Sequence, residues 1–268
     1  MTHVFQFSRF GKYFVYELNR LRNNFGVSLL AMGILPLIVY VFSGILKMFS
    51  GSFSPVVMGQ EGRISLYCFA TLFLVIAFPS KVWGNLTEKH AGSEYLMIPA
   101  SRLEKFLSMM LVALVVVPLV FNVLYLSSDA LLCALFKDCG EPLVYLPSKL
   151  NALLAEDGTL RLVGGGFWIG YMVLVGNILL YLLGALFFKK AKPAKTILCM
   201  FLLSILGALI IRLVAGPEFM SLENDVRMRD YIMKHPEFSV NLLLHLSLTL
   251  PAVVLAVLTW FRLKYLKH

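Results

Sequence analysis

Six long apolar runs separated by charged segments dominate the pattern of this chain. Each run is long enough, as a helix, to cross a hydrocarbon core about 30 Å thick. The pattern therefore predicts an all-α integral membrane protein whose six transmembrane helices form one unit over residues 27–268. The runs are, approximately, Val27–Leu46, Ile64–Ser80, Phe106–Ser128, Leu162–Phe188, Thr196–Gly216 and Val240–Phe261.

The segment before the first run has a helical period of its own. Apolar side chains recur every three or four residues, and charged residues occupy the other positions. This pattern is typical of an amphipathic helix that lies in the membrane interface, and it predicts an interfacial elbow helix over residues 1–26. A helix packed against the spans on the cytosolic side is the alternative. A turn at Asn23–Gly26 is expected to lead into the first span. The apolar positions are Phe7, Phe10, Phe14, Leu18, Leu21 and Phe25.

Charge then orients the chain in the membrane. Hydrophobic residues make up 59% of the chain, charged residues 15%, and the mean hydropathy is +0.80. The side with both termini has fifteen Lys and Arg and only four Asp and Glu. The other side has eight Lys and Arg and eleven Asp and Glu. Cytosolic loops retain basic residues. We therefore expect a multi-pass protein of the plasma (inner) membrane with both termini cytosolic. Residues 81–105 would form an inner loop, and residues 47–63, 129–161 and 217–239 would form outer loops.

The same asymmetry accounts for the sequence pI of about 9.4 without a nucleic-acid partner. A basic inner face also attracts anionic membrane lipid. Membrane lipid is therefore an expected partner, and nucleic acid is not.

The inner loop has the most organised polar pattern. Asn85 with Glu88 fits a helix start, Gly92 permits a turn, and Pro99 prevents a helix from continuing through it. Ser101 and Glu104 then have the spacing of a capping box that opens the third span. The pattern predicts a short helix, a break and a second helix start on one membrane face.

An elbow helix, six spans and this structured loop resemble the permease subunit of type-2 ATP-binding-cassette exporters. The loop follows the order of the family's motif: an acid, a glycine, a leucine, a proline, a small residue and a charged helix start. It lacks the Glu-Ala-Ala start of importer permeases, and its glycine is too near the proline for that class. The matching residues are Glu88, Gly92, Leu96, Pro99, Ala100, Ser101, Arg102 and Lys105.

The resemblance implies that this loop contains a coupling helix that docks in a groove of a separate ATPase subunit. It also implies a second permease subunit, identical or different, because the family works with pairs of each. The residues expected to couple to the ATPase are Glu88, Lys89, His90, Gly92, Tyr95 and Leu96.

The motifs of catalysis are absent from the sequence. There is no GxxxxGK[ST] segment to hold phosphates, no HExxH zinc motif and no GxSxG nucleophile turn. The chain is therefore expected to be a transport subunit and not an enzyme. It would bind no cofactor or metal directly, and ATP would act through the partner subunit.

Three polar residues within the spans are candidates for a pathway or subunit contact. Asn122 and Asn177 are expected to make interhelical hydrogen bonds. Arg212, near the outer boundary of its span, either reaches the headgroups or pairs with an outer acid such as Glu218 or Asp129.

Prolines and cysteines add two structural expectations. Pro36, Pro118 and Pro251 should kink their spans. Cys133 and Cys139 fall on the outer side, where oxidation is possible, but their spacing permits a disulfide without requiring one.

Together these features predict an exporter permease for an amphipathic or lipid-like cargo. A secondary transporter, or an accessory membrane protein such as an immunity factor, is the alternative. An ion-coupled carrier usually has a carboxylate near the membrane midplane, and none of the predicted spans contains one.

Overall fold

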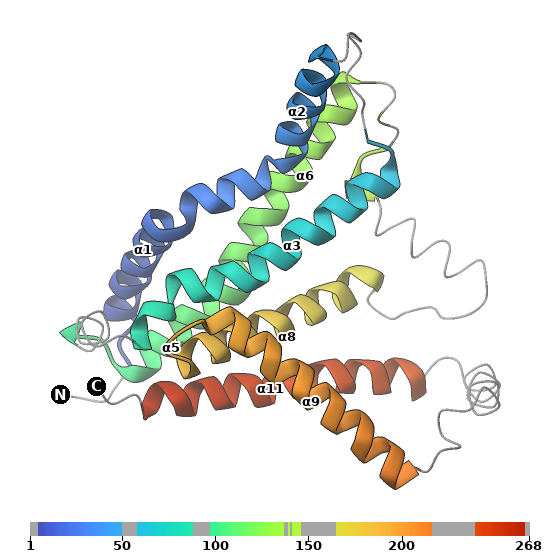
Figure 1. Cartoon of the computed structure of the whole chain (residues 1–268). Helices are drawn as coiled ribbons and strands as arrows, with labels where there is room; N and C mark the ends of the chain where they lie inside the picture. Colours follow the sequence, from blue (N-terminus) through green and yellow to red (C-terminus); the bar gives the residue numbers. More distant parts are fainter. Residues whose placement is uncertain are drawn as a thin grey trace. The chain divides into compact units, whose positions relative to one another are not determined.

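The computed structural model is all-helical over the part of the chain that it describes (Figure 1). That part comprises residues 5–49, 58–87, 97–136, 139, 141–145, 165–215 and 239–265; only the backbone is described at 165–169, 208, 210–215 and 239–246. Within it, four helices are long and apolar enough to cross a membrane, or five if one bent pair counts as a span. These helices characterise a multi-pass membrane protein, and the six-span count stays a prediction.

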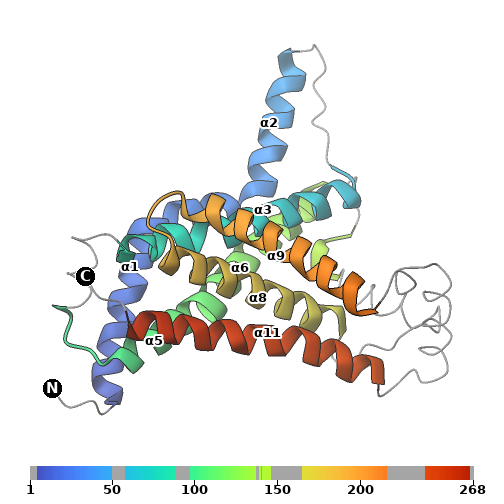
Figure 2. The ribbon, with the colours of Figure 1, turned by 60° about the horizontal axis from the view of Figure 1, so that its bottom comes forward.

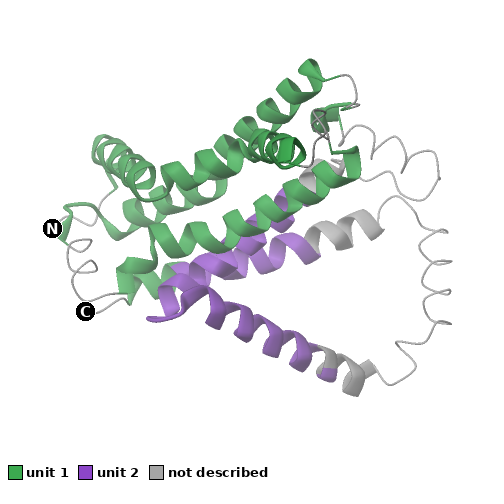
Figure 3. Ribbon diagram, turned by 45° about the horizontal axis from the view of Figure 1, so that its top comes forward, with its two compact units in different colours: residues 1–146, 260–268 green, residues 147–259 purple. Residues whose placement is uncertain are grey.

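Two compact units divide the chain, and each is described by itself (Figure 3). The first contains residues 1–146 and 260–268, and the second contains residues 147–259. Helices α1 (Phe7–Gly33), α2 (Leu35–Phe49), α3 (Gln60–Val82), α5 (Arg102–Leu111) and α6 (Val117–Leu135) belong to the first unit, with the short turns η1 (Gly84–Thr87) and η4 (Leu143–Tyr145). Helices α8 (Gly165–Phe187), α9 (Lys192–Ala215) and most of α11 (Ser239–Lys264) belong to the second.

The first helix differs from the sequence prediction. We expected a turn at Asn23–Gly26, but α1 runs without a break over 27 residues to Gly33. The chain then bends by 58° into α2 (Figure 2). The break lies two residues before Pro36, as the proline predicts. The predicted turn is therefore wrong, and residues of the predicted first span extend the N-terminal helix.

Side-chain packing explains why α1 continues through the two asparagines. Phe25 is 1% exposed and packs its ring against Phe78 of α3, with 5.5 Å between the ring centroids. Burial of a large aromatic side chain outweighs the small helix penalty of Asn and Gly. The buried face of the helix is Tyr13, Glu17, Leu21, Phe25, Leu29, Met32 and Gly33. Phe10 and Phe14 flank this face half-buried, and Phe7 is exposed.

Where α1 ends, it crosses α6 at close range. The Ser128 hydroxyl donates a 2.9 Å hydrogen bond to the Gly33 carbonyl oxygen. A Cβ placed on Gly33 would lie 2.5 Å from the Leu124 Cβ, so only glycine fits this crossing. The bend at Ile34 is thus held to α6 by a small residue and a polar contact.

The second long helix of this unit contains an irregular stretch. Residues 102–135 form one helix of 34 residues, in which Val112–Val116 are π-helical between α5 and α6. The Val117 N–H donates to the Val112 carbonyl oxygen, five residues back. Pro118 follows and has no N–H to donate, which favours such a local shift of the hydrogen-bond register. The structure thus shows a change of hydrogen-bond register before Pro118, and the predicted kink there stays a prediction.

In the second unit, α8 and α9 pack closely through a glycine. A Cβ on Gly184 would overlap the Thr196 side chain. Ile178, Leu179, Leu182 and Leu186 form the buried face of α8. The turn between the helices places Ala191 at a φ of 50°, in the left-handed region. The predicted fifth span, Thr196–Gly216, forms most of α9, and the sixth forms most of α11.

Candidate functional site

The residues predicted to couple to an ATPase fall outside the described part of the chain. This applies to Glu88, Lys89, His90, Gly92, Tyr95 and Leu96. The structure describes the two sides of this loop. The turn η1 follows α3 and ends at Thr87, and residues 97–100 lead into the cap of α5.

The capping box predicted at Ser101 is present. The Glu104 N–H donates to the Ser101 hydroxyl oxygen at 3.2 Å, and the Ser101 N–H donates to Glu104 Oε2 at 2.8 Å. These reciprocal bonds satisfy two backbone donors that a helix start leaves open. The helix that contains the predicted third span therefore begins where the sequence predicts, directly after the loop.

Glu104 also binds the N-terminal helix, which the sequence did not indicate. Arg9 donates from Nε to Oε2 and from Nη2 to Oε1, both at 2.8 Å. The Gln6 N–H donates to Oε1 at 2.9 Å. The carboxylate is fully buried although Arg9 is partly exposed. A bidentate pair with added backbone donors has a defined geometry and can satisfy a buried charge. We call these four residues, Gln6, Arg9, Ser101 and Glu104, the inner clasp.

A second buried carboxylate, that of Glu17, lies on α1 about two turns beyond Arg9. Glu17 is 1% exposed, accepts a 2.6 Å hydrogen bond from the Tyr13 hydroxyl, and lies 3.7 Å from Arg20 Nη1. Lys105, next to Glu104 on α5, is also buried and interacts electrostatically with Glu17. Charges of both signs thus join α1 to α5 at the end where the predicted coupling loop returns.

Another polar cluster lies at the opposite end of the same long helix. Arg63, in the first turn of α3, is 4% exposed and donates from Nη1 to Asp129 Oδ1 at 2.9 Å and Oδ2 at 3.1 Å. Its Nη2 donates to the carbonyl oxygens of Cys139 at 2.8 Å and Glu141 at 2.9 Å. Asp129 Oδ2 also accepts a hydrogen bond from the Leu143 N–H at 2.8 Å. We call this set the outer cluster.

A disulfide between Cys133 and Cys139 is part of the outer cluster. Cys133 lies on α6, which continues beyond the predicted end of its span to Leu135. Arg63 Nη1 lies 2.9 Å from Cys133 Sγ. The disulfide that the sequence permitted is therefore present. It ties to α6 the segment whose carbonyl oxygens accept hydrogen bonds from Arg63.

The two clusters are far apart along one helix. At about 1.5 Å per residue, the 29 steps from Glu104 to Cys133 span about 44 Å. This length exceeds a hydrocarbon core of about 30 Å. If this helix spans a membrane, its length puts the inner clasp and the outer cluster on opposite faces.

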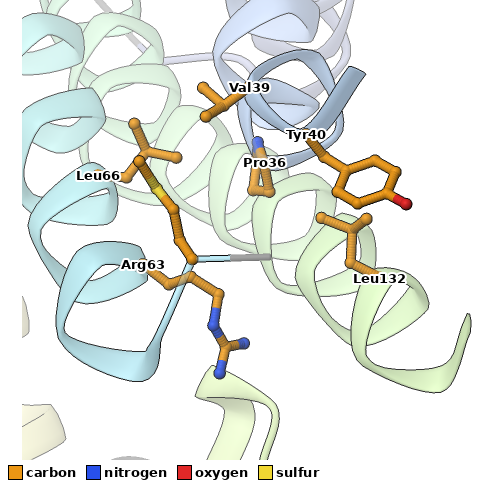
Figure 4. A pocket seen from close by; sticks show the side chains of 7 residues that line it. Pro36, Val39, Tyr40, Arg63, Leu66 and Leu132 are labelled. Atoms are coloured by element: carbon orange, nitrogen blue, oxygen red, sulfur yellow. The ribbon is translucent and has the colours of Figure 1, made fainter. Parts of the chain in front are cut away.

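A small cavity borders the outer cluster between α2, α3 and α6 (Figure 4). Its volume of about 20 Å³ suits one water molecule and is too small for an organic substrate. The aliphatic stem of Arg63 borders it, and the guanidinium points away (Figure 4). The other lining residues are Pro36, Val39, Tyr40, Met58, Leu66 and Leu132.

The three polar residues predicted inside the spans have different environments. Asn122 Oδ1 accepts a 2.6 Å hydrogen bond from the Tyr67 hydroxyl on α3, so the interhelical bond is confirmed. Asn177 donates to the Val173 carbonyl oxygen within its own helix, and its interhelical bond stays a prediction. The Arg212 side chain lies outside the described residues. Asp129, one of its proposed partners, binds Arg63.

Sequence reasoning treated Arg9 and Arg63 only as charges that set topology. The Arg63–Asp129 pair could have been inferred from the sequence, because the two residues lie at the same membrane end of consecutive predicted spans. The inner clasp had a weaker one. Glu104 was assigned to a capping box, which leaves its carboxylate able to accept further hydrogen bonds.

The described residues contain no group of three or more His, Cys, Asp and Glu side chains that could hold a metal ion. Most of the polar groups described in the first unit bind one another and so link neighbouring helices. Comparison with known proteins adds no assignment: the chain matches no protein-family model, no curated protein and no solved structure.

Proposed function

We propose that this chain is the membrane-spanning permease subunit of an ATP-binding-cassette exporter. A separate ATPase subunit would dock on the loop that contains Glu88 to Leu96, and a second permease subunit would complete the path. The cargo would be amphipathic or lipid-like, because the predicted spans supply apolar walls with few polar groups.

The observation that carries this proposal is the inner clasp. Glu104 closes the capping box directly after the predicted docking loop and also holds Arg9 of α1. A displacement at the end of the loop would therefore reach α1 through charged hydrogen bonds. Because α1 is continuous to Gly33, the same displacement would reach the bend at Ile34. A partner that pushes on the loop would thus move two helices together.

The outer cluster supports the proposed orientation. Disulfides persist in oxidising compartments, and Cys133–Cys139 lies at the end of the long helix remote from the inner clasp. The excess of Lys and Arg in the opposite segments favours the same orientation. The proposed docking loop would then face the cytosol, where ATP is available.

A charge reversal with a matched control tests the docking assignment. The chain is co-expressed with a candidate ATP-binding-cassette ATPase from the same genome, purified and reconstituted in vesicles. An ATPase gene beside the gene for this chain would be the first candidate. Glu88→Lys should abolish co-purification of the ATPase. Glu61→Lys makes the same change at an exposed site on the proposed outer face and should preserve co-purification. Wild-type recovery of the ATPase with Glu88→Lys would contradict the docking assignment.

The role of the inner clasp needs a different readout. Arg9→Gln should leave the ATPase bound but lower cargo-stimulated hydrolysis at least fivefold, since the loop would no longer move α1. Arg22→Gln removes an exposed charge from the same helix and should have no such effect. Equal stimulation in both variants would refute transmission through the clasp. Absence of any ATPase partner would favour an accessory membrane protein.

A further inference from the structure

The outer cluster contains a chemical feature that the proposed transport role does not use. Arg63 Nη1 contacts both the Asp129 carboxylate and the sulfur of Cys133, the latter at 2.9 Å. The guanidinium is buried, so water does not screen these contacts. A buried cation thus lies directly against one sulfur of the disulfide.

We propose that Cys133 and Cys139 are a redox-active pair that exchanges with dithiols on the outer face, with Arg63 stabilising the reduced form. This inference is independent of the proposed transport function and takes from that proposal only the orientation of the chain. The class of reaction partner is a dithiol in a thiol–disulfide exchange.

The physical basis is the change in charge at Cys133. A disulfide sulfur is a weak, neutral acceptor, so its contact with Arg63 contributes little in the oxidised protein. A thiolate in the same position has a full negative charge beside a guanidinium. Neighbouring cations stabilise cysteine thiolates, and stabilisation of the reduced form makes a disulfide more readily reduced. Arg63 therefore shifts the exchange toward the dithiol form.

The exposure of the two sulfurs sets the order of steps. Cys139 is 2% exposed, whereas Cys133 is only half-buried. A thiolate of the reductant attacks Cys133 Sγ, forms a mixed disulfide and releases the Cys139 sulfur, which takes a proton. The second thiolate of the reductant then attacks its own sulfur in the mixed disulfide and releases the Cys133 thiolate beside Arg63. Two electrons pass to the protein, and the dithiol leaves as a disulfide.

Reduction also changes the partners of Arg63. The Cys133 thiolate competes with Asp129 for Nη1, and the segment with the Cys139 and Glu141 carbonyl oxygens loses its covalent link to α6. The redox state of the pair therefore determines how firmly residues 139 and 141–145 are held on α3 and α6.

The test is an equilibrium titration of the purified full chain in detergent against reduced and oxidised dithiothreitol. Cys68 and Cys199, the free cysteines, are replaced by Ser so that a mass-tagged maleimide reports only this pair. Arg63→Gln should shift the exchange constant at least tenfold toward the disulfide, a change of about 30 mV. Asp129→Asn should shift it at least tenfold the other way, because the thiolate no longer shares Arg63 Nη1 with a carboxylate.

The opposite signs distinguish a redox-active pair from a structural brace. If the disulfide only braces the cluster, Arg63→Gln loosens the segment and makes the pair easier to reduce. Glu61→Gln removes an exposed carboxylate from the first turn of α3, outside the cluster, and should leave the constant unchanged. If Arg63→Gln does not fold, the pH dependence of Cys133 alkylation in a Cys139→Ser variant decides: a profile with the ordinary thiol pKa of about 8.5 overturns the proposal, because a structural brace alone does not lower that pKa. A constant that is unchanged in Asp129→Asn, or shifted toward the disulfide, overturns the proposal.

Discussion

Substitution of Gly33 by Ala should separate α1 from α6 at the bend. The Ala Cβ would lie 2.5 Å from the Leu124 Cβ, whereas carbon atoms prefer about 3.5–4.0 Å. The helices would have to move apart by about 1 Å. No rotamer change relieves this contact, because the backbone fixes both Cβ positions. The same separation would break the hydrogen bond that the Ser128 hydroxyl donates to the Gly33 carbonyl oxygen.

The magnitude follows from a matched control on the same helix. Gly26→Ala meets only the Arg22 side chain at 3.5 Å, which is an ordinary contact. Both variants gain about 1 kcal/mol of helix propensity, so this gain cancels between them. The difference in unfolding free energy is then the overpacking cost of about 1–3 kcal/mol. Loss of the Ser128 bond adds about 1 kcal/mol.

Denaturation of the purified protein in mixed detergent micelles measures this difference. Trp83 is fully buried in the first unit, and in a background with Trp168→Phe and Trp260→Phe its fluorescence reports unfolding of that unit. Gly33→Ala should unfold at a lower denaturant fraction than wild type, and Gly26→Ala at the same or a higher one. A Gly33→Ala midpoint at or above that of Gly26→Ala would refute the close crossing.

Three further predictions concern the other unit and the ends of the helices. Ala191→Gly should stabilise the chain by about 1 kcal/mol, because Ala191 has a φ of 50° that glycine adopts without strain; a thermal melt that is unchanged or lowered would contradict this. Ser101→Ala should lower the unfolding free energy by about 1 kcal/mol through loss of the cap, whereas the conservative change Ser101→Thr should keep most of that free energy. In a background without the free cysteines, an impermeant thiol reagent should label Glu61→Cys but not Lys190→Cys in intact cells, since both positions are exposed and the proposed topology places them on opposite faces; the reverse pattern would invert the topology.

The helices themselves could be predicted from the sequence, because long apolar runs and capping residues act locally. The predicted span Ile64–Ser80 lies within α3, and the Ser101 cap begins α5 at Arg102. The break in the first helix could not be placed by local preference. Asn23 and Gly26 weaken a helix by amounts that packing of Phe25 offsets, whereas Pro36 removes a hydrogen bond and adds a steric clash.

The two polar clusters could not be predicted from local sequence patterns, for a different reason. Arg9 and Glu104 are 95 residues apart in the chain, and Arg63 and Asp129 are 66 apart. Helical period and capping patterns describe neighbours within one element. Pairing between elements depends on how helices pack, and one sequence without a known fold does not define that. The coupling residues between Glu88 and Leu96 stay a prediction.

The distribution of constraints along residues 102–135 indicates where this helix can bend. Charged hydrogen bonds hold it at Glu104 and at Asp129, and a disulfide adds to the second. Between these ends lies the π-helical stretch Val112–Val116, followed by Pro118, where the backbone hydrogen-bond register changes. Irregular stretches of this kind are where helices deform most easily. We therefore expect a motion that passes along this helix from the inner clasp to be absorbed there, whereas α1, which is continuous to Gly33 and bonded to Ser128, is the path that carries it toward the outer end. Relative movement of the two ends then needs no break in either set of ionic contacts.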